Sequence, residues 1–288
     1  MQPPLPSATP TWHNDIYDAI SPSREELTAA GKTVIVVGAG SGIGRETALA
    51  FAAAGAARVI LLGRSESALA ATAASLPQSV KSEVFVADVT DEKRLAEVAS
   101  AAGKWDILIL AAGYTSSPSS IVGSTTDEWW QNFETNTKGT YLVTKTFLPT
   151  ANPSHASVIA LTTGTTALPV TMLNGLSPYI ASKLAQTKII EHLAAENPNL
   201  FAAILHPGFV ETDIFKKSGA KAEALPMDTV QLPAHFAVWL ASSEAAFLKG
   251  RSVWANWDVD ELKKSAGVIE SGQLLTSGIN GWPFTPLA

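Results

Sequence analysis

Tyr179 and Lys183 are the two residues of this sequence whose types and spacing most directly suggest chemistry. On a helix, positions four residues apart lie on the same face, one turn from each other. A free phenol has a pKa near ~10 and is a poor proton donor at neutral pH, but a nearby positive charge favours the phenolate and lowers that pKa. A tyrosine tuned in this way can protonate a carbonyl oxygen while hydride reaches the carbon. Alone, the pair is a weak signal, because many helices carry one by chance.

A glycine-rich turn, Gly38-Ala-Gly-Ser-Gly-Ile-Gly44, lies between an apolar β-branched run (33–37) and an alanine-rich helical stretch (45–54). A dinucleotide pyrophosphate requires a tight turn, a close backbone approach and free N–H groups at a helix start. Gly38, Gly42 and Gly44 meet these needs because they have no Cβ. A turn that only joins strand to helix is the alternative, but the position in an opening strand–turn–helix unit favours a cofactor site.

The end of the next expected strand indicates which dinucleotide binds. An NAD site usually has an acidic residue there, for the ribose hydroxyl groups. This sequence instead has Gly63, which leaves space, and Arg64, whose fixed positive charge suits a 2′-phosphate. NADP(H) is therefore predicted, and a solvated loop position for Arg64 is the alternative. Asp88, at the end of the third strand, could accept a hydrogen bond from adenine, or it could only cap the following helix.

Strand and helix patterns alternate along most of the chain. Alternation of this kind predicts an α/β protein, a three-layer doubly wound Rossmann fold with a central parallel sheet of about seven strands. The expected strands are 33–37, 58–62, 84–87, 107–110, 157–161, 201–205 and 252–256. The expected helices are 45–54, 65–74, 91–102 with Thr90 as N-cap, a long helix within 126–148, 178–196 and 233–242.

Three segments are expected. A proline-rich N-terminal arm (1–31) has no clear hydrophobic period and is predicted to pack on the surface, with a subunit interface as one option. The dinucleotide-binding and catalytic domain follows (32–258). A C-terminal extension (259–288) is expected to pack on the same domain.

Composition narrows the function classes. The net charge of −6 and the pI of about 5.4 argue against a nucleic-acid or anionic-membrane partner, both of which need a basic face. The absence of cysteine excludes disulfides, a cysteine nucleophile and thiolate metal ligands, and no HxxxH pair supports a metal site. No signal peptide or long apolar span is evident, so a soluble cytoplasmic protein is expected.

Taken together, these motifs resemble the short-chain dehydrogenase/reductase family. The glycine turn, Tyr179 and Lys183 have the family's spacing, and the resemblance spans roughly residues 32–258. Four further stretches are similar to its motifs: Leu110-Ala-Ala-Gly113, Asn136-Thr-Lys-Gly139, Leu161-Thr-Thr-Gly164 and Pro207-Gly-Phe-Val-Glu-Thr212.

The resemblance implies roles for individual residues. Thr163 would orient the substrate oxygen, Tyr179 would donate the proton, Lys183 would bind the nicotinamide ribose, and Asn136 would hold a water that relays protons. The Pro207-Gly208 turn would pack on the nicotinamide. The cofactor-binding residues would be Gly38, Ser41, Gly42, Ile43, Gly44, Gly63, Arg64, Asp88, Val89, Ala112, Gly113, Tyr179, Lys183, Pro207, Gly208, Val210 and Thr212.

Some positions depart from the family pattern. Thr163 replaces the usual serine, and because the stretch up to Tyr179 is slightly long, Thr162 or Thr165 could compete for its role. Leu110-Ala111 replaces the paired asparagines. Phe209, Phe215 and residues 216–227 are expected to form a mobile lid over the substrate. His206, just before the Pro-Gly turn, is interpreted as a packed residue rather than a base.

The leading function is interconversion of a carbonyl and an alcohol on a small hydrophobic substrate with NADP(H). A non-redox step on the same scaffold (dehydration, epimerisation or cyclisation) and a non-catalytic NADP(H) sensor are the alternatives. The sequence is also similar to short-chain reductases of filamentous fungi, which suggests specialised metabolism. The resemblance further implies a homodimer or homotetramer formed through the helices around 127–150 and 178–196.

Overall fold

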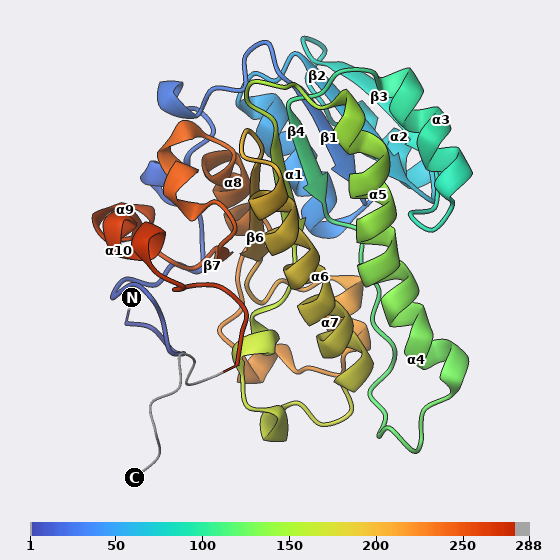
Figure 1. The fold of residues 1–288 in the computed structure, drawn as a ribbon, viewed down its shortest axis with the longest axis vertical. Helices are drawn as coiled ribbons and strands as arrows, with labels where there is room; N and C mark the ends of the chain where they lie inside the picture. Colours follow the sequence, from blue (N-terminus) through green and yellow to red (C-terminus); the bar gives the residue numbers. More distant parts are fainter. Residues whose placement is uncertain (1, 280–288) are drawn as a thin grey trace.

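The computed structural model describes residues 2–279, and the final part of the predicted C-terminal extension, residues 280–288, lies outside them. Figure 1 shows a central sheet with helices on both faces, as the sequence predicted. Within the described residues the sheet has seven parallel strands in the order β3-β2-β1-β4-β5-β6-β7. The strands are β1 (Thr33–Val37), β2 (Arg58–Gly63), β3 (Lys81–Val86), β4 (Ile107–Leu110), β5 (Ser157–Leu161), β6 (Phe201–His206) and β7 (Ser252–Trp254).

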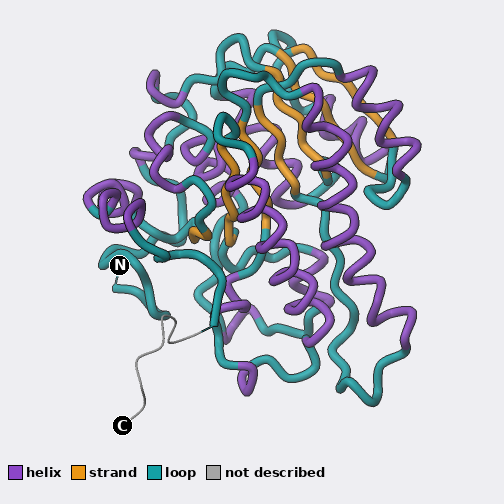
Figure 2. The backbone as a smooth tube through the Cα atoms, viewed as in Figure 1, coloured by secondary structure: helices purple, strands orange, loops and turns teal. Residues whose placement is uncertain are grey.

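Helices connect successive strands and cover the sheet, as the tube in Figure 2 makes clear. The longer ones are α1 (Gly42–Ala53), α2 (Glu66–Ala74), α3 (Glu92–Ala102), α4 (Thr126–Phe133), α5 (Gly139–Phe147), α6 (Ser177–Glu196) and α8 (Gln231–Leu240). Short helices α7 (Asp213–Lys217), α9 (Val259–Lys264) and α10 (Ala266–Ser271) complete the described part.

The two faces of the sheet carry separate cores because successive side chains of a strand point to opposite faces. On β1, Val34 and Val36 pack in the core that includes α1 and α8, whereas Ile35 and Val37 pack in the core that includes α3, α5 and α6. Four of the five β1 residues are buried. This double burial explains the continuous apolar run in the sequence.

Several predicted boundaries were wrong for local reasons. Asp91, not Thr90, caps α3, because its side chain accepts a hydrogen bond from the Arg94 N–H at 2.9 Å. The expected long helix within 126–148 is interrupted between α4 and α5 by a π-helical turn, Glu134–Lys138. Strand β3 begins three residues earlier than the predicted residue 84, because it is an edge strand whose mixed exposure hides its apolar period. Strand β7 ends at Trp254 instead of residue 256.

The strand order reverses between β1 and β4, and in such sheets ligands bind beyond the carboxyl ends of the strands at that point. The glycine turn lies there. Gly38 has φ +91°, and a Cβ on it would lie 2.6 Å from the Ala112 nitrogen of the chain after β4. A Cβ on Gly44 would lie 2.2 Å from the Gly38 carbonyl oxygen. The turn can therefore close only with glycine at both positions.

Substitution of Gly44 tests this packing. Gly44→Ala should lower the free energy of unfolding by about 1–3 kcal/mol, because a backbone oxygen occupies the space of the added methyl group. Gly267→Ala is the matched control in α10, where a Cβ meets nothing within 4 Å, and it should be neutral or stabilising by up to about 1 kcal/mol. Urea unfolding measures both, and equal effects would show that the close approach is unimportant.

Candidate active site

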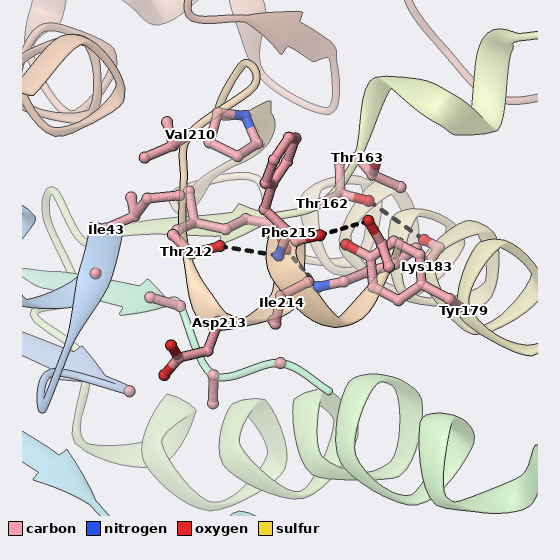
Figure 3. Close-up of a pocket in the computed structure, with 18 of the residues that line it drawn as sticks. Ile43, Thr162, Thr163, Tyr179, Lys183, Val210, Thr212, Asp213, Ile214 and Phe215 are labelled. Atoms are coloured by element: carbon pink, nitrogen blue, oxygen red, sulfur yellow. Dashed lines mark hydrogen bonds between the residues drawn. The ribbon is translucent and has the colours of Figure 1, made fainter. Parts of the chain in front are cut away.

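One cavity of ≈ 1450 Å³ opens at the carboxyl ends of the strands and gathers almost all predicted site residues. Figure 3 shows part of it, with Ile43 and Thr212 on one side and Thr163, Tyr179 and Lys183 on the other. The predicted residues that line it are Gly38, Ser41, Gly42, Ile43, Gly44, Gly63, Arg64, Asp88, Val89, Ala112, Gly113, Thr163, Tyr179, Lys183, Pro207, Gly208, Val210 and Thr212. Asn136 does not line the cavity but lies behind it.

The phosphate end of this cavity is the start of α1. The helix begins at Gly42, which has φ +51°, and the Ser41 side chain makes no capping hydrogen bond. The first N–H groups of a helix have no partner within it, and they favour an anion. A Cβ on Gly42 would lie 3.2 Å from the Thr212 methyl group, so glycine keeps the passage open. The backbone therefore fits a dinucleotide phosphate.

The far end of the cavity carries Arg64 and Asp88. Arg64 is exposed and takes part in none of the ion pairs found among residues 2–279, so its charge is available to a ligand. Asp88 accepts hydrogen bonds from the Thr90 N–H at 2.8 Å and from the Thr90 hydroxyl at 2.7 Å. These bonds order the loop before α3, whose cap is Asp91, and they use only one of the two Asp88 carboxylate oxygens.

Thr163 is the threonine that reaches Tyr179. Its hydroxyl is hydrogen-bonded to Thr165 at 2.9 Å, and it lies near enough to Tyr179 to lower the pKa of the phenol. Thr162 instead points at the backbone of α6, where its oxygen lies 3.5 Å from the Lys183 carbonyl. The geometry therefore favours Thr163 over the two competing threonines. Burial raises the pKa of Tyr179 to about 12, an effect larger than the lowering by Thr163, so the expectation that Lys183 lowers this pKa is wrong for the protein by itself.

Lys183 is buried, 3% exposed, and is held by neutral acceptors. Its Nζ donates to the Leu161 carbonyl at 2.8 Å and to the Gln186 Oε1 at 2.9 Å. No carboxylate pairs with it among the described residues, and burial lowers its pKa to about 7. No pattern in the sequence pointed to Gln186, although it lies three residues after Lys183 on the same helix.

Asn136 is joined to Lys183 by buried polar side chains. The Gln186 Nε2 donates to the Thr140 hydroxyl at 3.0 Å, which donates to the Asn136 carbonyl at 2.8 Å. The Asn136 amide itself donates to the Tyr114 carbonyl and the Ser182 hydroxyl and accepts from the Tyr114 N–H. These bonds fix the π-helical turn against the chain that follows β4.

The remaining predicted features lie around the cavity mouth. His206 packs edge-on against Trp254 and Phe209, and burial lowers its pKa to about 3, in keeping with a packed neutral residue. The segment predicted to form a lid overlaps α7, whose Ile214 (Figure 3) lies 3.2 Å from where a Cβ on Gly113 would be. Two residues that the sequence analysis missed are Leu5, which lines the cavity, and Asp228, which lies behind Gly208.

Neither a metal site nor a membrane span emerges from the described residues. Between residues 2 and 279, no three His, Asp or Glu side chains are grouped so as to hold a metal ion. Within the same residues, no helix has the length and apolarity needed to cross a membrane.

Comparisons with known proteins agree with this geometry. Residues 32–223 match the family described as short chain dehydrogenase. The short chain dehydrogenase/reductase nsrO of Aspergillus novofumigatus is 33% identical over 95% of this chain and 97% of its own. A short chain dehydrogenase/reductase of Claviceps purpurea is 35% identical over 96% of this chain and 95% of its own. A solved structure of a short chain dehydrogenase/reductase family protein is 28% identical, with a TM-score of 0.70, and covers 78% of this chain and 96% of that one.

The Lys183–Gln186 contact generates a stability prediction. Gln186→Met should lower the free energy of unfolding by about 1–3 kcal/mol, because it leaves the buried Lys183 and Thr140 each without one partner. Gln131→Met is the matched control, since Gln131 lies exposed on α4 and bonds only Thr135. It should change stability by no more than about 0.5 kcal/mol. Indistinguishable urea midpoints for the two variants would contradict the network.

Proposed function

Because the chain belongs to the short-chain dehydrogenase/reductase family, we propose that it is an NADP(H)-dependent oxidoreductase that interconverts a carbonyl and an alcohol. The observation that carries this proposal is the convergence of Thr163, Tyr179 and Lys183 in the same cavity as the glycine turn. A cofactor bound along the turn would extend toward the Tyr179 hydroxyl, where proton transfer to a carbonyl oxygen takes place. The bound nicotinamide supplies the hydride.

Each side chain has a separate task in this proposal. Thr163 donates or accepts a hydrogen bond at the substrate oxygen and keeps it beside Tyr179. Tyr179 gives its proton to the oxygen during reduction, and because burial raises its pKa to about 12, this transfer requires a positive charge that stabilises the phenolate. The Lys183 ammonium stabilises the phenolate that remains and binds the ribose. The relay water that the family resemblance assigns to Asn136 stays a prediction.

The preference for NADP(H) rests on Arg64. Its exposed guanidinium lies at the cavity wall beside Gly63, after β2, where an acidic side chain would repel a 2′-phosphate. A guanidinium presents several N–H donors in a plane and binds phosphate at two oxygens. No acidic side chain pairs with it among residues 2–279, so a cofactor phosphate would meet an uncompensated charge.

The substrate is an apolar carbonyl compound. Support comes from the large aliphatic and aromatic side chains that line the cavity beside the polar ones. From the segments before α6 and after β6 these are Leu168, Met172, Leu173, Leu176, Phe209, Phe215 and Leu225. An apolar wall with a few polar groups at the reacting centre is typical of a site that binds hydrophobic small molecules.

Assembly into a homodimer or homotetramer through α4, α5 and α6 belongs to the same proposal. These helices expose large apolar side chains: Trp130 is 54% exposed, Tyr141 50% and Leu184 43%. Exposed apolar side chains on these helices support contact with another chain.

Replacement of Arg64 tests the cofactor preference. Arg64→Ala should weaken NADPH binding by about 10- to 100-fold, because a charge-assisted hydrogen bond to the phosphate is lost, and should leave NADH binding unchanged. Tryptophan fluorescence titration measures both constants. Arg94→Ala, which removes an equal charge outside the cavity, is the control. Equal losses for NADPH and NADH in the Arg64 variant would contradict a phosphate contact.

Removal of the Tyr179 hydroxyl tests the proton donor. Tyr179→Phe should reduce the rate of NADPH oxidation with an apolar ketone or aldehyde by about 100- to 10,000-fold, with little change in the Kd for NADPH. The exposed Tyr141 provides the control, and Tyr141→Phe should keep full activity. A Tyr179 variant that turns over the carbonyl panel at the unmodified rate would exclude the proposed acid.

A further inference from the structure

The N-terminal arm packs against the chain just after the lid and just after β7, beyond the part of the chain that matches the family, residues 32–223. The His13 N–H donates to the Asn256 carbonyl at 2.9 Å, and the Asn256 side-chain amide donates to the His13 carbonyl at 2.9 Å. The Thr229 N–H donates to the Asn14 carbonyl at 3.0 Å. Leu5, earlier in the arm, lines the cavity itself. The arm is thus attached at the active-site end of the molecule.

Asp228 is the buried centre of this attachment, 8% exposed. Its Oδ1 accepts from the Asn14 amide at 2.6 Å and from the Asn256 amide at 2.8 Å, and its Oδ2 accepts from the Phe209 N–H at 2.6 Å. No Lys, Arg or His pairs with this carboxylate among residues 2–279. Three N–H donors from three separate segments therefore hold it, and each bond to a carboxylate is stronger than one between neutral groups.

This carboxylate lies against the turn that is predicted to face the nicotinamide. Gly208 has φ +84°, and a Cβ on it would lie 2.2 Å from the Asp228 Oδ2. The Asp228 N–H also donates to the Phe209 carbonyl at 2.9 Å, so the two residues are bonded in both directions. Phe209 is the first residue of the lid and Asp228 follows its last, so both lid ends are joined at this point.

We propose that Asn14 and Asp228 are positioning residues, through which the N-terminal arm holds the Pro207–Gly208–Phe209 wall and both ends of the lid in place for the nicotinamide ring. The inference rests on the proposed function, because it takes the ring to bind against this wall. Asn14 supplies one of the two donors on Oδ1, and its own amide also donates to the Pro226 carbonyl at 3.2 Å. Without it, the carboxylate and the end of the lid lose their connection to the arm.

The binding of two ligands distinguishes a positioning role of Asn14 from a general effect on the stability of the fold. NADPH contains the nicotinamide ring, whereas 2′-phospho-ADP-ribose lacks it and occupies only the remainder of the cofactor site. Asn14→Leu, which preserves size, should weaken NADPH binding about tenfold and leave binding of the fragment unchanged. Thr11→Val is the matched control, because it removes the Thr11 hydroxyl bond to Glu261, at 2.7 Å, without touching Asp228. It should alter neither Kd.

The Asn14–Asp228–Phe209 hydrogen bonds, here called the clamp, can be tested directly by hydrogen exchange of the Phe209 amide in the cofactor-free protein. The Phe209 amide should exchange faster in the Asn14→Leu variant than in the unmodified chain. In the Thr11→Val variant its exchange rate should be unchanged, because only the Asn14 substitution removes a hydrogen bond from Asp228. Exchange that is equal in all three proteins would overturn the clamp, as would a loss of affinity shared by NADPH and the fragment. If the Phe209 amide exchanges faster in the Asn14→Leu variant but the unmodified chain binds neither ligand, the clamp is supported and the proposed cofactor is refuted.

Discussion

The buried ammonium of Lys183, held by a carbonyl and a side-chain amide instead of a carboxylate, is the constraint on which the site depends. A buried cation without a counter-charge loses solvation that neutral acceptors only partly replace, and its pKa falls. The same burial raises the pKa of the neighbouring phenol, Tyr179. The protein surroundings of the pair therefore disfavour charge on either residue. In the proposed function, ribose hydroxyl groups would add hydrogen-bond acceptors for the ammonium.

The fold provides the surroundings that this arrangement requires. Leu161 ends β5 and presents its carbonyl to Lys183, while Gln186 and Thr140 connect α6 to α5 and to the π-helical turn. Parallel strands that are buried on both faces fix the strand ends relative to each other, and the helix that carries the Tyr–Lys pair packs along them. A buried lysine without a counter-charge costs stability, so its presence is better explained by function than by stability.

Local features were predictable from the sequence and remote ones were not. The strand–helix alternation, the glycine turn and the Tyr179–Lys183 spacing are short-range patterns with a physical meaning, so the fold followed from them, and almost all of the predicted site residues line the cavity. The choice between Thr162 and Thr163 depends on how β5 meets α6, and it required the structure. The bond between Asn14 and Asp228 joins residues 214 positions apart, and a single sequence carries no sign of such a pair. The prediction of Thr90 as the N-cap of α3 was wrong for a simpler reason: Thr90 and Asp91 are adjacent, and the side chains of both can cap a helix.

The measurement that tests the central claim most directly is the titration of the Lys183 amine in the cofactor-free protein, followed by NMR with isotope-labelled lysine. The Lys183→Met variant identifies the signal by its absence. The account predicts an inflection near pH 7, far below those of the exposed lysines, because the ammonium is buried among neutral acceptors. An inflection at the ordinary lysine value of 10.5 would mean that the amine is solvated or paired with an anion, and it would contradict the account.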